Sequence, residues 1–223
     1  MRPGRSLFAP LFFFLALLIL PQASPGQAPG AEKPAEQTAA PTYDGDWWLS
    51  LGGWEHYGVI SGYKDCYVFE YRGDLAFTRE IQTYIDALTK YYLSDVALRK
   101  RTVSEALDFV RKFANEQSAP GASDTPTKAH GDFDGTFWFD ADPAAELGFV
   151  EGYLACHSAK VKDADGKFSK APSEYVDLIN KAYNITDDTD EVDADKAPMK
   201  IADVLHRLKD EQSPPPAKPA SQH

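Results

Sequence analysis

Cys66 and Cys156 are the only thiols in this chain of 223 residues. Each ends the pattern Gly-Tyr-x-x-Cys, and in an oxidising compartment two such thiols can form a disulfide. Alternatively, each is a small buried residue whose partner lies out of reach. Neither has a CxxC neighbour, so the chemistry expected of the pair is structural cross-linking and not redox catalysis.

Asp44 and Asp134 are the carboxylates that stand in matching surroundings, each followed by a glycine and an aromatic segment. Paired carboxylates can act as general acid and base in a hydrolase, although such pairs are assembled in space. An Asp-Gly pair is also a turn signal, so each aspartate could instead hold its aromatic segment as a turn or cap residue. The sequence leaves both interpretations open.

Aromatic side chains follow each aspartate. They are Trp47, Trp48, Trp54 and Tyr63 after the first aspartate, and Phe137, Trp138 and Tyr153 after the second. Such side chains can line a groove for a sugar or a peptide, or they can close the ends of a small helical core. Together with the two aspartates they define one possible function, a hydrolase or binding protein for cell-wall or other polymer fragments.

No other pattern of catalytic or metal-binding residues stands out. The five histidines lack HxxxH or HExxH spacing, and no GxSxG motif or phosphate loop occurs. With Gly166 as the sixth residue of an EF-hand, Val161 and Pro172 would fill the first and twelfth positions, which calcium does not accept. We expect the turn at Gly166 and the acidic loop from Thr186 to Lys196 to be solvated, with no metal site and no cofactor.

The candidate residues lie in a stretch that occurs twice. The segment from Tyr43 to Cys66 returns without a gap from Phe133 to Cys156, at a constant offset of 90 residues. Such self-similarity indicates a duplicated structural unit. The aromatic segment that opens each copy is too short to be a helix of its own, so we predict an aromatic turn there.

A helix is expected after each aromatic turn, from about Gly53 to Phe69 and from about Pro143 to Ser158, where Asp142 can cap the start. Glycines at helical spacing form a stripe that ends at the cysteine of each helix: Gly58, Gly62, Gly148 and Gly152. Glycine inside a helix costs about 1 kcal/mol relative to alanine. We therefore expect a close backbone approach, either to the next helix of the same copy or to the sister helix of the other.

Two more helices are expected in each copy. One has apolar residues at helical spacing from Ile81 to Tyr92 with Thr78 as its N-cap, and its counterpart includes 175–183. Another starts at Thr102, where Glu105 completes a capping box. Its echo begins at Pro198. The apolar face of the Thr102 helix is expected to bury Val103, Leu107, Val110 and Phe113.

The predicted fold is therefore all-α, with two tandem three-helix pseudo-repeats packed as one six-helix domain. The repeats span residues 43–116 and 131–212, joined by a polar linker at 117–130. A basic start followed by an apolar run is typical of a secretory signal peptide, which we place at 1–30. A leader at 31–42 and a tail at 213–223 have the composition of disordered segments.

The charge of the chain limits its partners. The formal net charge is −11, from 34 acidic and 23 basic residues. Such a surface repels nucleic acid and anionic lipid, and it suits a cationic partner. Neither cysteine follows the signal segment closely enough for lipid attachment. We expect a periplasmic or secreted protein with no membrane contact after cleavage of the signal peptide.

The pattern D-G-x-[WF]-W, followed by G-h-h-x-G-Y-x-x-C, resembles small exported all-helical bacterial proteins of unknown function, including the Tai-like immunity proteins of type VI secretion amidases. The resemblance covers Gly58–Cys66 and Gly148–Cys156. It implies a protein that binds and neutralises a periplasmic cell-wall amidase. This chain departs from that family in having the unit twice and its cysteine after the Gly-Tyr pair, so no binding residue is carried over.

The leading hypothesis from the sequence is an exported, non-enzymatic helical protein that binds a protein partner, in an immunity or inhibitor-like role. The alternative is the polymer-fragment binding protein or hydrolase that would use the aromatic turns with Asp44 and Asp134.

Overall fold

The computed structural model describes residues 42–71, 77–116, 133–160, 168–186, 189 and 191–210. Within these ranges the chain contains eight α-helices and one 3₁₀ helix, and no strand beyond two isolated bridges. The all-α class is confirmed. The predicted signal peptide, the linker, the tail and all but one residue of the leader lie outside the described residues.

The helices follow the chain in two similar series. The first series is α1 (Gly45–Ser50), α2 (Gly53–Tyr71), α3 (Ile81–Ser94), the 3₁₀ helix η2 (Val96–Lys100) and α4 (Val103–Glu116). The second is α5 (Gly135–Asp140), α6 (Pro143–Lys160), α7 (Pro172–Tyr183) and α8 (Ile201–Asp210).

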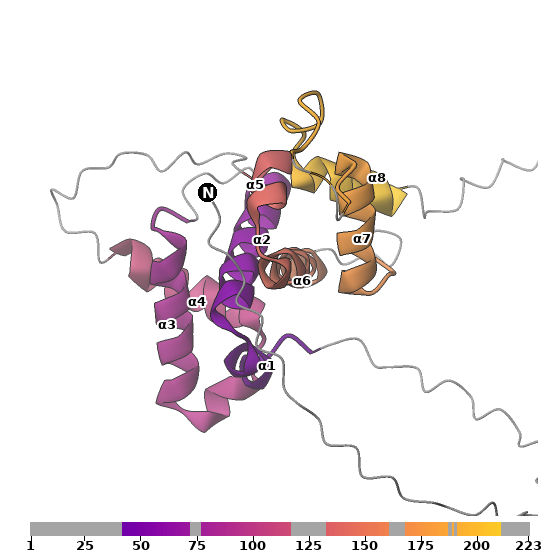
Figure 1. Ribbon diagram of the computed structural model, residues 1–223. Helices are drawn as coiled ribbons and strands as arrows, with labels where there is room; N and C mark the ends of the chain where they lie inside the picture. Colours follow the sequence, from indigo (N-terminus) through magenta and orange to yellow (C-terminus); the bar gives the residue numbers. More distant parts are fainter. Residues whose placement is uncertain are drawn as a thin grey trace, which may run out of the picture. The chain divides into compact units, whose positions relative to one another are not determined.

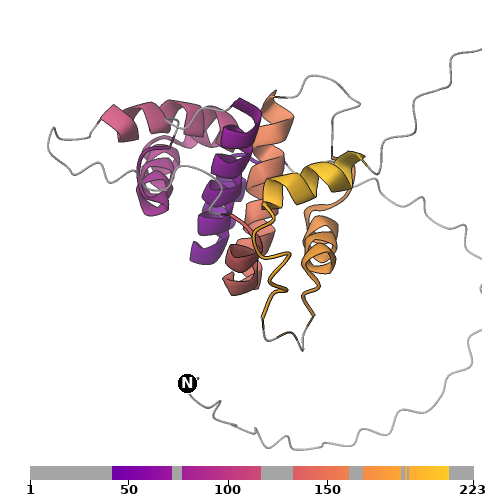
Figure 2. The same cartoon turned by 90° about the horizontal axis from the view of Figure 1, so that it is seen from above.

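Helices α2 and α6 lie side by side and form the centre of the fold (Figures 1 and 2). Helix α3 packs on α2 and on α4, while α7 packs on α6 and on α8. Besides the α2–α6 contact, α4 touches α6 and α8 touches α2 across the two series. None of the described helices is long and apolar enough to cross a lipid bilayer.

The glycine stripe lies where α2 and α6 meet. A Cβ atom placed on Gly58 would overlap the carbonyl oxygen of Ala145, and one on Gly62 would overlap that of Phe149. The arrangement is reciprocal, since a Cβ on Gly148 or Gly152 would strike a carbonyl of α2. The four glycines thus allow two backbones to approach more closely than any other residue type would permit.

The two aromatic turns are in fact short helices, α1 and α5, so the prediction that these segments are not helical is wrong. Asp44 caps α1 by accepting hydrogen bonds from the backbone N–H groups of Asp46 and Trp47, at 3.1 and 3.0 Å. Asp134 caps α5 in the same way, at 3.0 and 3.3 Å. A six-residue helix is marginal alone. Here the cap and a buried tryptophan, Trp48 or Trp138, hold each in place.

The starts of two other helices also differ from expectation. Helix α3 begins at Ile81 with Glu80 as N-cap, and not with Thr78. Helix α8 begins at Ile201, after turn residues that include Pro198.

The Thr102 capping box is confirmed, since the N–H of Thr102 donates to Glu105 Oε2 at 3.0 Å and the N–H of Glu105 donates to Thr102 Oγ1 at 3.3 Å. Phe113, however, is not buried. It remains 50% exposed, because α3 covers only part of the apolar face of α4.

Candidate functional site

Asp44 and Asp134 do not form a catalytic pair, because each is used as a helix cap. One oxygen of each carboxylate accepts the two backbone N–H groups at the start of α1 or α5. Asp134 also lies 3.5 Å from the Nζ atom of Lys200. A carboxylate engaged in this way holds the backbone and is not positioned to move a proton on a substrate.

The tryptophans that follow the aspartates belong to the core. Trp48 and Trp138 are fully buried, and their indole N–H groups have partners on α3 and α7 respectively. Trp48 Nε1 donates to Thr89 Oγ1 at 3.1 Å, and Trp138 Nε1 donates to Asn180 Oδ1 at 2.7 Å. These two indoles therefore cannot line a ligand groove.

The neighbours of the buried tryptophans close the ends of the core. Trp47 and Phe137 are partly buried, packing edge-to-face against Tyr43 and Phe133 respectively. Tyr63 and Tyr153 are fully buried. Most of the aromatic residues identified in the sequence therefore have a structural role, and Trp54 is the exception.

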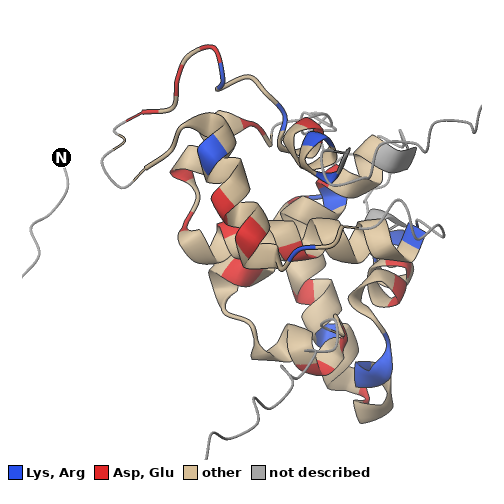
Figure 3. Ribbon diagram, turned by 90° about the vertical axis from the view of Figure 1, so that its right-hand side faces the viewer, with Lys and Arg blue, Asp and Glu red and all other residues tan. Residues whose placement is uncertain are grey.

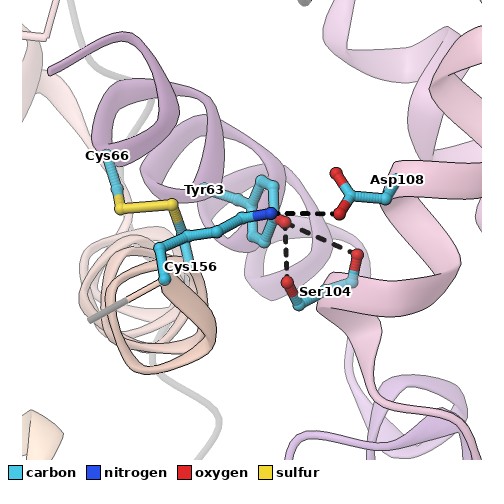
Figure 4. Close-up of a disulfide and its surroundings, with 6 residues drawn as sticks. Tyr63, Cys66, Ser104, Asp108 and Cys156 are labelled. Carbon is cyan, nitrogen blue, oxygen red and sulfur yellow. Dashed lines mark hydrogen bonds and ion pairs between the residues drawn. A yellow bond between two sulfur atoms is a disulfide. The ribbon is translucent and has the colours of Figure 1, made fainter. Parts of the chain in front are cut away.

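Cys66 and Cys156 are joined by a disulfide between α2 and α6, with their Cα atoms 6.2 Å apart (Figure 4). Of the two alternatives that the sequence leaves open for these cysteines, the structure has the disulfide. Both cysteines are fully buried, in contact with the core. The bond therefore serves as a cross-link between the central helices, and a buried disulfide of this kind is compatible with an oxidising compartment.

Helix α4 is attached to the central pair by polar contacts beside the disulfide. The hydroxyl groups of Tyr63 and Ser104 lie 2.8 Å apart, and both are buried (Figure 4). Lys160 Nζ donates to Asp108 Oδ2 at 3.1 Å. Burial raises the pKa of Tyr63, so its hydroxyl stays protonated. These contacts fix the position of α4 on the central helix pair.

Asp65 is a buried carboxyl group that sequence reasoning missed. It lies on α2 near the start of α8, it is 6% exposed, and its Oδ2 atom has no hydrogen-bond partner in the described part of the chain. Burial raises the pKa of Asp65 to about 7, with Lys200 offsetting part of the increase and Asp203 adding to it. The folded state therefore accommodates the neutral form of Asp65 better than the charged form.

The buried Asp65 predicts a pH dependence of stability. Because the pKa of Asp65 is about 7 in the folded state, against an ordinary value of 3.8, the folded state binds the proton more tightly between these pH values. Stability should therefore fall as pH rises from about 4 to 7. The free energy of unfolding of the Asp65→Asn variant, measured with urea, should fall less than that of the wild type over this pH range. The difference should be on the order of 2 kcal/mol, since the site can relax around the charge. Parallel pH profiles for the variant and the wild type would contradict the prediction.

The comparison with the variant is needed because two other carboxyl groups act in the same direction. Burial raises the pKa of Glu146 to about 7, with Asp142 adding to the effect. Burial also raises the pKa of Glu151 to about 7, with Glu55 adding to it. Both remain in the Asp65→Asn variant, so they cancel in the difference.

An open aromatic groove lies between α3 and α4. Tyr91, Phe109 and Phe113 stack along it with ring centroids 5.5 and 4.8 Å apart, and both phenylalanines are half exposed. The groove encloses about 590 Å³ and carries one acidic and one basic side chain, Asp86 and Lys90. Its apolar lining and open mouth suit a segment of another protein better than a small polar substrate.

A second groove lies where α2 begins, beside the junction of α5 and α6. It encloses about 550 Å³ and is lined by Trp54 and Tyr57 from α2 and by Phe137, Asp140 and Asp142 from the second series. Trp54 is 63% exposed, and its ring centroid lies 6.5 Å from that of Tyr57. The only sequence signal for this groove was that Trp54 has no aromatic counterpart in the second copy.

The acidic loop from Thr186 to Lys196 is described only in part, since residues 187, 188 and 190 lie outside the described ranges. Asn184 Nδ2 donates to Asp193 Oδ2 at 2.6 Å, which ties the loop to the end of α7. Among the described residues no group of three or more His, Cys, Asp or Glu side chains is arranged to hold a metal ion.

Acidic residues occur on several helices of the described fold (Figure 3). The described part of the chain therefore presents these two aromatic grooves, with acidic side chains on several of its helices. Comparison of the chain with protein-family models, with curated proteins and with solved structures found no match.

Proposed function

We propose that this chain is an exported, non-enzymatic helical protein that binds a protein partner. The observation that carries the proposal is the position of its exposed apolar side chains. Those that are large and exposed in the described part of the chain all fall between positions 54 and 113: Trp54, Phe69, Leu93, Val96, Phe109 and Phe113. Two of them, Phe109 and Phe113, lie beside Tyr91 in the groove between α3 and α4, and an exposed apolar patch is typical of a binding surface.

The chemistry of these side chains supports a protein as the partner. Aromatic residues that fill pockets supply most of the energy in many protein interfaces. The groove between α3 and α4 offers Phe109 and Phe113 on one helix face, with Tyr91 opposite. The net charge of −11 favours a cationic partner and fast association with it. An immunity or inhibitor-like role, implied by the resemblance to Tai-like proteins, falls within this proposal.

The proposal includes a duplicated architecture of two tandem three-helix units, each preceded by its short aromatic helix. Equivalent contacts in the two series support it. The isolated bridge between Asp44 and Thr102 is matched by one between Asp134 and Lys200. In this architecture the large exposed apolar side chains of the described residues belong to the first unit, so the partner is expected to contact that unit.

Export is also part of the proposal. It rests on the basic and apolar start of the chain and on the disulfide, which is compatible with an oxidising compartment. The hydrolase alternative is not retained, because Asp44 and Asp134 cap helices and the indoles of Trp48 and Trp138 are buried.

The test is site-specific crosslinking in the cell. The full chain is expressed with the photoreactive amino acid benzoylphenylalanine in place of Phe109 or Phe113, both half exposed on α4. The matched control carries it in place of Arg207, an exposed residue on α8. We expect one crosslinked adduct of the same mass from both α4 positions and none from the control.

Two outcomes would overturn the proposal. Absence of a specific adduct at low and at moderate salt would mean that the apolar face binds no protein. An adduct with twice the mass of the chain would mean that the face serves self-association instead. Capture of the same protein by the Arg207 control would show that the adduct is not specific.

A further inference from the structure

The groove at the start of α2 combines an aromatic surface with acidic side chains. Trp54 is exposed at its mouth, with Tyr57 packed edge-to-face against it at an interplanar angle of 78°. Asp140 ends α5, and Asp142 stands just before α6, so two carboxylates face the aromatic pair across the groove. Among the described residues that line the groove, none is Lys or Arg.

The carboxylates of Asp140 and Asp142 have different structural roles. Asp142 caps α6, since its Oδ1 atom accepts the N–H of Ala144 at 2.9 Å. It thereby balances the positive end of that helix. Asp140 is exposed and does not cap a helix, so its negative charge is the one available to a bound cation. An aromatic face beside a carboxylate is the arrangement that favours an ammonium or guanidinium group.

The residues of this groove can be compared with those at the equivalent positions of the other copy. At the fixed offset of 90 residues, Trp54 corresponds to Ala144 and Tyr57 to Leu147. The two aspartates correspond to Ser50 and Gly52. The equivalent place in the other series thus lacks the Trp-Tyr pair and the two aspartates, and it has Trp47 and Glu55 where this groove has Phe137 and Ala145. Neither component is required by the shared helical framework, and both occur together on one side only.

We propose that this groove binds an Arg or Lys side chain in a basic segment of the partner protein, with the cation stacked on Trp54 and paired with Asp140. The inference rests on the proposed function, since it names the chemistry of the partner. The groove volume of about 550 Å³ accommodates such a side chain with its neighbouring backbone. Its acidic rim matches the excess of acidic residues in the whole chain.

The test uses a short probe peptide in place of the partner. Acetyl-Gly-Arg-Gly-Arg-Gly-amide is titrated into the full, oxidised chain labelled with ¹⁵N, and the indole N–H resonance of Trp54 is followed. A peptide with citrulline at both arginine positions is the neutral control. We expect a saturable shift with the arginine peptide that salt weakens, and no shift with the citrulline peptide.

Two variants assign the binding to the groove. Asp140→Asn and Trp54→Ala should each weaken the arginine peptide by about fivefold, the effect of removing one exposed charge pair or one cation–π contact. The backbone amides of Phe137 and Ala141 report binding when the indole is absent. The matched control is Phe113→Ala, which removes an exposed aromatic side chain from the other groove and should leave the affinity unchanged.

Equal binding of the citrulline peptide would overturn the inference, because the groove would then recognise shape and not charge. An unchanged affinity in Trp54→Ala, or an equal loss in Phe113→Ala, would also overturn it. The crosslinking experiment separates this inference from the proposed function. If a partner is captured on α4 but the arginine peptide does not bind at Trp54, the proposed function is retained and the cation site is rejected. If the peptide binds but no partner is captured, the proposed function is rejected and the cation site is retained.

Discussion

Reduction of the Cys66–Cys156 disulfide is expected to lower the free energy of unfolding by about 4 to 5 kcal/mol. The bond joins residues that are 90 positions apart, so in the unfolded chain it closes a long loop and removes much of the conformational freedom gained on unfolding. Both cysteines are fully buried, so reduction should occur only as the chain opens. The loss is also a large share of the total stability of a domain of this size.

Urea unfolding of the wild type with and without dithiothreitol measures this effect. The control is the double variant Cys66→Ala with Cys156→Ala, on which the reductant should have no effect. A change below about 1 kcal/mol in the wild type would mean that the helix contacts alone hold the two series together, against the loop-closure argument.

Replacement of Gly62 by alanine should destabilise the fold by about 3 kcal/mol, at the upper end for overpacking. The added methyl group would overlap the backbone carbonyl of Phe149, which cannot rotate away as a side chain would. Gly152→Ala should do the same, since its Cβ would strike the carbonyl of Val59. To accept either methyl group, α2 and α6 must separate, and the packing along their whole contact weakens.

Gly53→Ala is the matched control for the glycine variants. Gly53 lies at the first position of the same helix, and a Cβ there meets nothing within 4 Å. Alanine has the higher helix propensity, so stability should stay the same or rise slightly. Chemical denaturation of the three variants compares them directly. A loss in Gly53→Ala equal to that in Gly62→Ala would show that close packing of the two backbones is not the cause.

Much of this arrangement could be predicted from residue spacing. Glycines four apart on two matching helices indicated a close backbone contact, and a cysteine at the end of each stripe indicated a possible cross-link. The spacing did not decide which helix each stripe would meet, because a stripe identifies a helix face and not its neighbour. The reciprocal contact of Gly62 with Phe149 and of Gly152 with Val59 identifies the partner.

Features that depend on tertiary contacts could not be predicted from the sequence. A six-residue segment such as Gly45–Ser50 has little helical stability alone, and it is held by a cap and by the burial of Trp48. Phe113 follows the apolar spacing of α4, yet spacing does not reveal that α3 leaves it uncovered. Asp65 reads as a surface residue between Lys64 and Cys66, and only the packing of α8 on α2 buries it.

The candidate binding site could be predicted only from positions at which the two copies of the sequence differ. Trp54 differs from its counterpart in the second copy, which is Ala144. No sequence pattern marks the carboxylates that face Trp54 across the groove. The residues shared by both copies turned out to serve the helices and the core. The residues in which the copies differ supply the surface that is available for a partner.

The pairing of α2 with α6 does not depend on the concentration of the protein. Two separate chains, each with one such helix, would meet through the same glycines but would come apart as their concentration fell. Here both helices belong to one polypeptide, so each faces the other at an effective concentration that does not change with the amount of protein present. A molecule present at low concentration can therefore complete its central helix pair without waiting for a second copy.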